Sequence, residues 1–329
     1  MTHEDMLAVT AIGALVIYSV TGGADFGGGV WDLLAVGPRA RAQREVIARA
    51  VAPIWEANHV WLIFVIVILF VCFPAAYAVV GTALHVPLTL MLVGIVLRGA
   101  AFAFRSHDYG PAQRRWDLVF ACASVVTPLM LGTCVGAVSS GAIDAHLDGT
   151  IGTDFVSSWL APFPLTVGAL TVVEFSFLAA TYLTLEAQHD VLRGDFRIRA
   201  LGSGVGTAVL GWAALALART GAPVVYEGLT GNPAILALTG LAAVASLGAC
   251  WIRQYTWARG LAIVHVATIV IGWAMAQYPY LVVPGQTVAN AHASDVVVQH
   301  VLLALEVGTA LLIPAFVWLY RVFKGAMND

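Results

Sequence analysis

The sequence predicts an all-α integral membrane protein with about nine transmembrane helices, and two features support this prediction. The first is composition: 60% of the 329 residues are hydrophobic and only 11% are charged, whereas soluble domains carry roughly 25% charged residues. Such a chain cannot cover itself with polar surface, so we expect it to be embedded in lipid. The second is a succession of apolar segments of about 20 residues, the length that a helix needs to cross the hydrocarbon core.

Each apolar segment is interpreted as a helix, because a segment that crosses lipid must satisfy its own backbone hydrogen bonds. Pro53 stands just before the second segment, where proline suits a first helical turn. Phe73-Pro74 and Gly81 are the only punctuation between the second and third segments. In chain order, the expected spans lie near residues 7–35, 56–79, 82–104, 118–138, 163–185, 201–218, 235–252, 259–278 and 300–322.

The basic residues alternate along the chain in step with these nine spans. The first, third, fifth and seventh connections and the C-terminal tail are basic, whereas Arg219 is the only basic residue in the even-numbered connections. Fourteen of the sixteen basic residues therefore fall on one side, and Arg98 lies inside the third span. Missing or adding one span would destroy this alternation. By the positive-inside rule, we expect the N-terminus outside and the C-terminus in the cytoplasm.

Several classes of function are excluded by what the sequence lacks. No polar segment is long enough to fold as a soluble catalytic domain, and the chain has no Walker loop and no Rossmann fingerprint. It also has no basic patch of the kind that binds nucleic acid. We therefore expect any chemistry to take place in or beside the bilayer.

Ionisable and amide side chains converge at one depth of the predicted bundle. Asp25 lies late in the first span within "TGGADFGGG", Glu56, Asn58 and His59 open the second, and Arg98 comes late in the third. A rise of about 1.5 Å per residue places all of them towards the cytoplasmic end. Ionisable residues inside a membrane mark proton or ion routes by default. We therefore predict a proton path that contains Glu56, Asp25, His59 and Asn58.

A structural interpretation of the same residues remains open. Asp25 and Arg98 would form an ion pair that pins the first and third spans together, and Glu56 would be a wetted residue of the first helical turn. Glu174 and Glu306 are further buried acids for which the sequence shows no evident basic partner. Each is either neutral and hydrogen-bonded or functional.

The histidines are candidate haem ligands, because haem is held by histidine in many cytochromes. His85 and His300 lie near the outer ends of spans, and only His59 and His265 match in depth. Because their helices need not touch, we predict no haem and no metal site within this chain.

Four sequence blocks occur in order over nearly the whole chain. They are "GGADFGGGVWDLL", "RAVAPIWEANHVWLIFVIVILFVCFPAAYA", "GIVLRGAAFAFR" and "AQYPYLVVP". Together they resemble subunit II of cytochrome bd-type quinol oxidases, including the cyanide-insensitive relatives. The block at residues 52–77, followed by Arg98 and Arg105, is specific, whereas the glycine-rich block alone would be weak.

The resemblance implies a fold and a set of partners. The fold would be one transmembrane domain over residues 1–329, made of two four-helix bundles (about 1–138 and 160–278) and one extra helix (300–322). The partner would be a separate subunit I that carries haem b, haem d and the quinol site. A small accessory subunit and membrane lipids are further partners. The location would be the bacterial cytoplasmic (inner) membrane.

The resemblance also implies a function. The complex would couple quinol oxidation to the reduction of oxygen to water, while this chain binds no haem, supports subunit I and helps to conduct protons from the cytoplasm. The acidic positions of the family fall on Asp25 and on Glu56, where many relatives carry Asp. Asn58, His59 and Arg98 match motif positions, and some relatives carry Gln in place of His59.

Two alternatives stay open at this point. A proton-coupled transporter would show internal repeats with helices broken near the midplane in both halves, whereas the glycine-rich stretch here is confined to the first span. A purely structural assembly subunit would stabilise the haem-bearing partner and conduct nothing.

Overall fold

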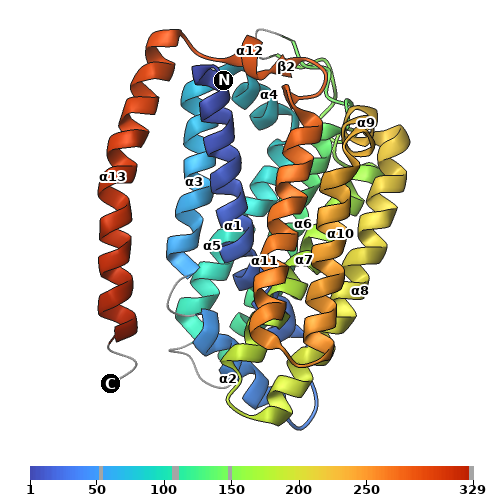
Figure 1. Ribbon diagram of the computed structural model, residues 1–329, viewed down its shortest axis with the longest axis vertical. Coiled ribbons are helices and arrows are strands. Elements are labelled where there is room, and N and C mark those ends of the chain that lie inside the picture. The colour runs from blue at the N-terminus through green and yellow to red at the C-terminus, as the bar shows by residue number, and fades with distance from the viewer. Residues whose placement is uncertain (52–54, 106–110, 147–149, 326–329) are drawn as a thin grey trace.

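The protein is almost entirely helical (Figure 1). The computed structural model describes residues 1–51, 55–105, 111–146 and 150–325. Within these ranges, eight helices are long and apolar enough to cross a membrane, or up to nine if the bent pair Ala57–Cys72 and Pro74–Ala83 is one span. The predicted all-α membrane fold is therefore confirmed. The long helices are α1 (His3–Leu33), α3 (Trp55–Cys72), α5 (His85–Arg105), α6 (Pro111–Ser139), α7 (Pro162–Glu186), α8 (Asp190–Gly221), α10 (Pro233–Trp251), α11 (Tyr255–Gln277) and α13 (Asp295–Gly325).

The second span differs from the prediction, because it is broken. The helix expected over 56–79 ends at Cys72, and the chain turns by 118° into α4 (Pro74–Ala83). Pro74 occupies the first turn of α4 and Phe73 is its N-cap residue. Proline has no N–H to donate and its ring clashes with the preceding turn, so Pro74 favours a break here, although two other helices continue through Pro128 and Pro314. The segment predicted as one span over 56–79 is therefore divided between α3 and α4.

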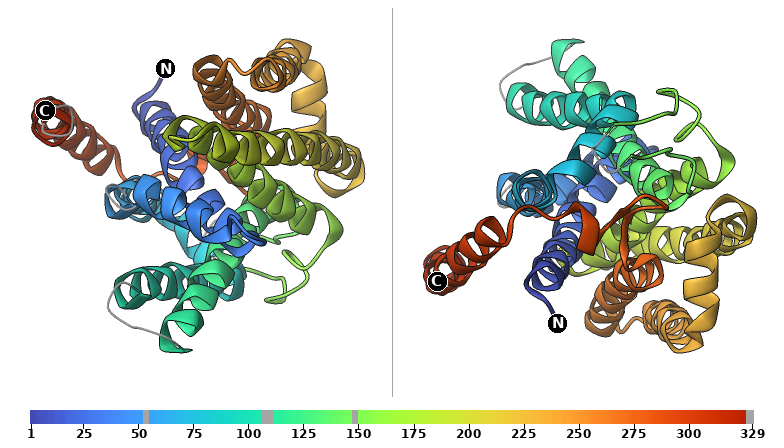
Figure 2. Two further views of the ribbon diagram at one scale, coloured as in Figure 1. Left: turned by 90° about the horizontal axis from the view of Figure 1, so that it is seen from below. Right: turned by 90° about the horizontal axis from the view of Figure 1, so that it is seen from above.

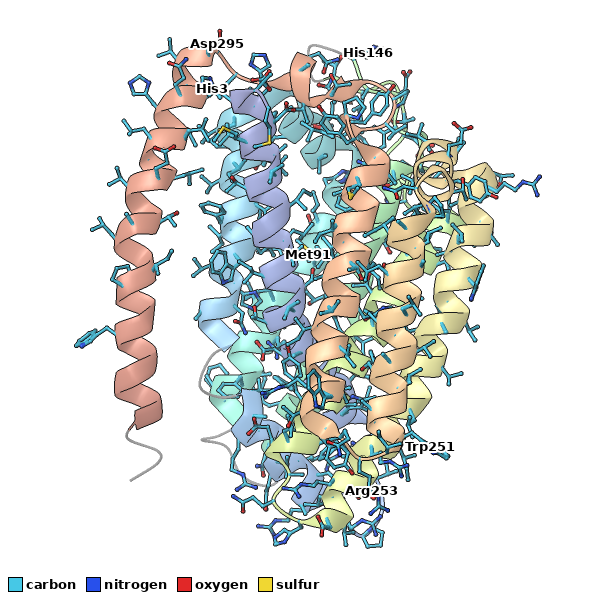
Figure 3. All side chains as sticks on the ribbon, in the orientation of Figure 1. His3, Met91, His146, Trp251, Arg253 and Asp295 are labelled. Atoms are coloured by element: carbon cyan, nitrogen blue, oxygen red, sulfur yellow. The ribbon has the colours of Figure 1, made fainter. Side chains whose placement is uncertain are left out.

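Short elements mark the two ends of the bundle. The end that carries α2 (Ala40–Val51), here called the α2 end, also holds the C-terminal end of α13 (Figure 1). The opposite end carries the N-terminus, α4, α9 (Pro223–Gly231), the β1–β2 hairpin (Tyr280–Val282, Gln286–Thr287) and α12 (Val288–Ala291), and is called the α12 end. Figure 3 places Trp251 and Arg253 at the α2 end and His146 and Asp295 at the α12 end.

Helix α7 lies at the centre of the packing and contacts α1, α6, α8 and α11. Two glycines four residues apart on α1 allow the closest of these approaches. A Cβ atom at Gly23 would collide with the ring of Phe175, and one at Gly27 would overlap the main-chain carbonyl of Phe175. Small residues at this spacing let two membrane helices approach backbone to backbone.

Helix α13 stands at the edge of the molecule (Figure 2). It packs against α1 and α3, and it leaves most of its length outside the main bundle. The chain that leads to it is anchored at the α12 end by the "AQYPYLVVP" block. Gln277 donates a hydrogen bond to the carbonyl of Leu281 at 3.1 Å, and Val283 N–H donates to the carbonyl of Val138 at 3.0 Å. This block therefore ties the end of α11 to the end of α6.

Candidate functional site

The centre of the candidate site is a buried carboxylate held by an amide. Asn58 Nδ2, from the first turns of α3, donates a hydrogen bond to Asp25 Oδ2 of α1 at 2.5 Å. The exposed fractions are only 9% for Asp25 and 6% for Asn58. A buried polar group is costly unless it is hydrogen-bonded, so Asn58 offsets part of the cost of placing an acid here. The predicted proximity of these two residues is therefore present in the structure.

Arg98 of α5 completes this group from the other side of α1. Its Nη2 donates to the main-chain carbonyl of Asp25 at 2.9 Å, and its Nε donates to Ser124 Oγ of α6 at 3.2 Å. The guanidinium lies over the rings of Phe26 and Phe120, 4.8 Å and 5.0 Å from their centroids. With an exposed fraction of 2%, Arg98 joins α1, α5 and α6 inside the bundle. The contact that the structure shows between Arg98 and Asp25 is thus to the backbone, while Asn58 holds the carboxylate.

His59 lies beside this group, half-buried between two aromatic rings. Its ring centroid is 6.0 Å from both Tyr18 and Phe26. Tyr18 is fully buried, and its hydroxyl has no hydrogen-bond partner among the described residues. Sequence reasoning missed Tyr18, although it stands seven residues before Asp25 and therefore on the same face of α1.

Glu56 belongs to the first turn of α3, two residues before Asn58. Its side chain lies outside the described part of the structure. The backbone alone places it near the α2 end of the same helix that carries Asn58 and His59.

Two more glycines of α1 make room for the polar side chains. A Cβ atom at Gly29 would collide with the hydroxyl of Ser124, the residue that accepts from Arg98. A Cβ atom at Gly22 would press on the ring of Tyr18. The glycine-rich block therefore does more than bring helices together, because it admits polar groups between them.

A second buried polar pair lies in another part of the bundle. Glu174 of α7 and His265 of α11 are 4% and 5% exposed, and His265 Nε2 is 3.5 Å from Glu174 Oε2. The other ring nitrogen, Nδ1, lies 3.0 Å from the carbonyl of Thr239 and must donate to it, because a carbonyl can only accept. The sequence showed no basic partner for Glu174, and the structure supplies one. No signal in the sequence indicates this pairing, because the predicted spans put Glu174 midway along its helix and His265 at the depth of His59.

Three features of the described residues bear on metal and haem ligation. These residues contain no group of three or more His, Cys, Asp or Glu side chains that could hold a metal ion. Both ring nitrogens of His265 face groups of the protein, so neither is directed at an iron. His59 is packed between two rings of its own chain.

Comparisons with known proteins agree on one family. The profile of the family described as "Cytochrome bd terminal oxidase subunit II" matches residues 4–323. The "Putative cytochrome bd menaquinol oxidase subunit II" of Bacillus subtilis is 21% identical over 98% of this chain and 96% of its own length. The "Cytochrome bd-I ubiquinol oxidase subunit 2" of Escherichia coli is 31% identical, but over 53% of this chain and 46% of its own length.

A solved structure shares the fold. A chain from "The structure of bd oxidase from Geobacillus thermodenitrificans" superposes with a TM-score of 0.80 at 23% identity, covering 98% of this chain and 99% of that chain. The sequence match covers the helices that carry Asp25, Asn58 and Arg98.

Proposed function

The chain belongs to the cytochrome bd terminal oxidase subunit II family, and from this membership we propose that it supports a haem-bearing subunit I and conducts protons towards it. The complex is a quinol oxidase, which couples the oxidation of a quinol to the reduction of oxygen to water. This chain is the non-haem subunit of that enzyme in the bacterial inner membrane. Oxygen reduction consumes protons, so a route for protons through one of the subunits is a chemical requirement of the complex.

The observation that carries the proposal is the group formed by Asp25, Asn58 and Arg98. A carboxylic acid can exchange a proton, and here it is held within apolar helices by a hydrogen bond from Asn58. Arg98 places a fixed positive charge beside it, which keeps the buried acid tolerable in a low dielectric. His59 and the buried hydroxyl of Tyr18 extend the polar group towards the middle of the bundle. Glu56, one helical turn from His59, supplies a second acid near the α2 end.

The direction of transfer follows from the distribution of charge. Arg39, Arg44, Arg49 and Arg193 belong to elements at the α2 end, and basic residues favour the cytoplasmic side. In this proposal the α2 end of the protein therefore faces the cytoplasm, and the N-terminus lies outside. Protons enter from the face nearest to Asp25.

The haems of the complex belong to subunit I in this proposal. Haem supplies the oxygen and electron chemistry, and this chain's own residues bind and relay protons. The two buried histidines support that division, because His265 uses both ring nitrogens on its own chain and His59 is enclosed by Tyr18 and Phe26.

The experiment removes the exchangeable proton and leaves the shape. Asp25→Asn retains an acceptor for Asn58 but cannot exchange a proton, and Glu56→Gln does the same at the mouth of α3. General acid–base steps typically contribute about 10²–10⁴-fold, so we expect quinol oxidase turnover of the purified complex to fall at least several-fold. Glu56→Asp should retain most activity. Asp154→Asn, an acid of the α12 end, is the matched control and should behave like the unaltered enzyme.

The haem spectrum of the complex separates this proposal from a purely structural role. If Asp25→Asn and Glu56→Gln both turn over normally at saturating quinol and oxygen, the proton route is refuted, while the family assignment stands. If both variants lose haem in parallel with activity, the site serves assembly instead.

A further inference from the structure

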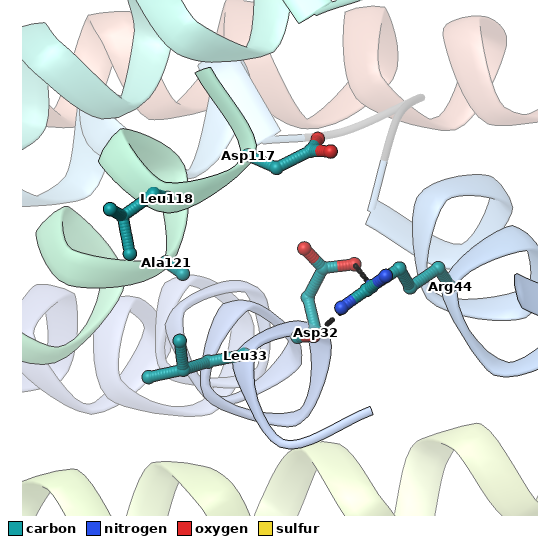
Figure 4. Close-up of a pocket in the computed structure, with 6 residues that line it drawn as sticks. All are labelled: Asp32, Leu33, Arg44, Asp117, Leu118 and Ala121. Atoms are coloured by element: carbon teal, nitrogen blue, oxygen red, sulfur yellow. Dashed lines mark hydrogen bonds and ion pairs between the residues drawn. The ribbon is translucent and has the colours of Figure 1, made fainter. Parts of the chain in front are cut away.

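A pocket lined by both charged and apolar side chains opens at the α2 end, between α1, α2 and α6. Its volume is about 290 Å³, and a liquid water molecule occupies about 30 Å³, so it has room for several waters. Figure 4 shows Asp32 and Asp117 facing the same space from α1 and α6, with Arg44 beside Asp32. The lining residues are Asp32, Leu33, Arg44, Asp117, Leu118 and Ala121.

Asp32 is the buried acid of this pocket, with an exposed fraction of 5%. Arg44 Nε lies 3.9 Å from its carboxylate and 3.4 Å from its main-chain carbonyl, and Arg44 Nη2 donates to the carbonyl of Ala35 at 3.2 Å. Arg44 therefore caps the last turn of α1, where a cation is favoured by the helix dipole. The same contacts hold the Asp32 carboxylate at the pocket wall. Asp117 is half-buried and stands nearer to solvent.

The pocket lies on the same face of α1 as the buried group that contains Asp25 and Arg98. Asp32 follows Asp25 by seven residues, which turns an α-helix by only about 20° from a whole number of turns and advances it about 10.5 Å. The two acids therefore share one face of α1. On α6, Ala121 lines the pocket, and Ser124 stands three residues further on. Ser124 accepts from Arg98, which in turn bonds to Asp25.

The turn of α1 between the two acids contains three successive glycines. Gly27 faces Phe175 of α7, Gly28 faces apolar side chains of α2, and at Gly29 the hydroxyl of Ser124 fills the place that a side chain would take. On the side of α6, the acids of the pocket are therefore followed along the seam by Ser124, which accepts from Arg98, and Arg98 donates to the Asp25 carbonyl.

We propose that this pocket is the aqueous inlet of the proton route, with Asp117 and Asp32 as the groups that capture protons for Asp25. A hydronium ion in the pocket transfers its proton to a carboxylate oxygen of Asp117 or Asp32, forming one O–H bond and leaving water. Asp32 then releases that proton through water to the Asp25 carboxylate, so that its own O–H bond breaks as one forms on Asp25, and Asp32 returns to the carboxylate. This inference rests on the proton route proposed above and specifies where the route begins.

The test measures turnover of the complete complex as a function of pH. Asp32→Asn and Asp117→Asn keep the size of each side chain and remove its exchangeable proton. With capture impaired, proton supply becomes limiting and the rate becomes proportional to proton concentration, so it approaches a decline of about tenfold per pH unit on the alkaline side. The losses should be several-fold near neutral pH, smaller at acid pH, and larger in the double variant. Asp32→Glu should restore most of the rate.

Glu45→Gln is the matched control, because Glu45 is an exposed acid of α2 that bonds to Arg41 and does not line the pocket. Its pH profile should match that of the unaltered enzyme. If the Asp32→Asn complex loses haem, the Asp117→Asn variant tests the inlet instead. Among the described contacts, the half-buried Asp117 side chain does not pair with Arg44, which caps the last turn of α1, so its replacement should leave assembly intact.

The two proposals fail in distinguishable ways. If Asp32→Asn, Asp117→Asn and the double variant all match Glu45→Gln while Asp25→Asn is impaired, the inlet is refuted and the proton route stands. If Asp25→Asn is also normal, the proton route itself is refuted. A loss that is equal at every pH would also overturn the inlet, because a merely structural change does not depend on the proton supply.

Discussion

Replacing Arg98 by alanine should prevent normal assembly of the complex, and the size of the effect follows from its contacts. Among the described contacts, the guanidinium donates a hydrogen bond to the Asp25 carbonyl at 2.9 Å and another to Ser124 at 3.2 Å. Hydrogen bonds from a charged group contribute about 1.5–3 kcal/mol each, so together about 3–6 kcal/mol is at stake. Removing one partner of a buried ionic group similarly costs about 3–5 kcal/mol. Protein domains are stable by only about 5–15 kcal/mol, so this loss should be visible as failed accumulation.

Arg98→Lys tests whether charge alone is sufficient. An ammonium keeps the charge but lacks the planar fork that serves both acceptors and stacks between Phe26 and Phe120. We therefore expect lysine to be intermediate between arginine and alanine. The assay is the amount of this subunit in membranes, by immunoblot, together with the haem content of the complex, by visible spectrum. Arg39→Ala is the control, because Arg39 pairs with Asp195 at the surface, where ion pairs contribute little. Full accumulation and full haem content in Arg98→Ala would refute this reasoning.

Three further predictions concern packing, sidedness and the second buried pair. Gly27→Ala should reduce accumulation of the subunit far more than Gly13→Ala. A Cβ atom at Gly27 would overlap the Phe175 carbonyl, whereas a Cβ atom at Gly13 would have no other atom within 4 Å. Equal immunoblot signals from the two variants would contradict this prediction. A cysteine placed at position 145 should react with an impermeant label from the outside of sealed vesicles, and labelling from the cytoplasmic side alone would reverse the orientation. Glu174→Leu and His265→Leu should each destabilise by about 1–3 kcal/mol, and the double variant by less than their sum; additive losses of thermal stability would mean that the pair does not interact.

The transmembrane helices could be predicted because lipid imposes a simple rule on the chain. A span must be apolar for about 20 residues, and the arginines fixed the number of crossings. The same rule could not predict the break after Cys72, since hydropathy sums residues and says nothing about the direction of the chain. Phe73-Pro74 was visible as punctuation, but the 118° turn into α4 depends on how α4 packs at the α12 end.

The depth of the polar residues could be predicted, but not their contacts. Counting residues along each helix placed Asp25, Asn58 and Arg98 at one level, and the structure brings them together. Which atoms meet depends on the rotation of each helix about its axis, which a single sequence does not give. The ion pair expected between Arg98 and the Asp25 carboxylate stays a prediction, and the hydrogen bond that Arg98 donates to the Asp25 main-chain carbonyl was not foreseen. Glu174 lacked a partner in the sequence because nothing there indicated that α7 and α11 lie side by side.

The two buried polar groups, Asp25 with its partners and the Glu174–His265 pair, differ in their contacts and therefore in the role that we assign to each. In the Glu174–His265 pair, Nδ1 donates to the carbonyl of Thr239 and Nε2 lies 3.5 Å from the carboxyl group, so both ring nitrogens face groups of this chain. The Asp25 group differs in its surroundings, because Asp32, on the same face of α1, lines the pocket at the α2 end. A site that exchanges protons must connect to water, and in our proposal this pocket supplies that connection. We therefore expect the Glu174–His265 pair to fasten α7 to α11, and we propose the α1–α6 seam as the place of proton exchange.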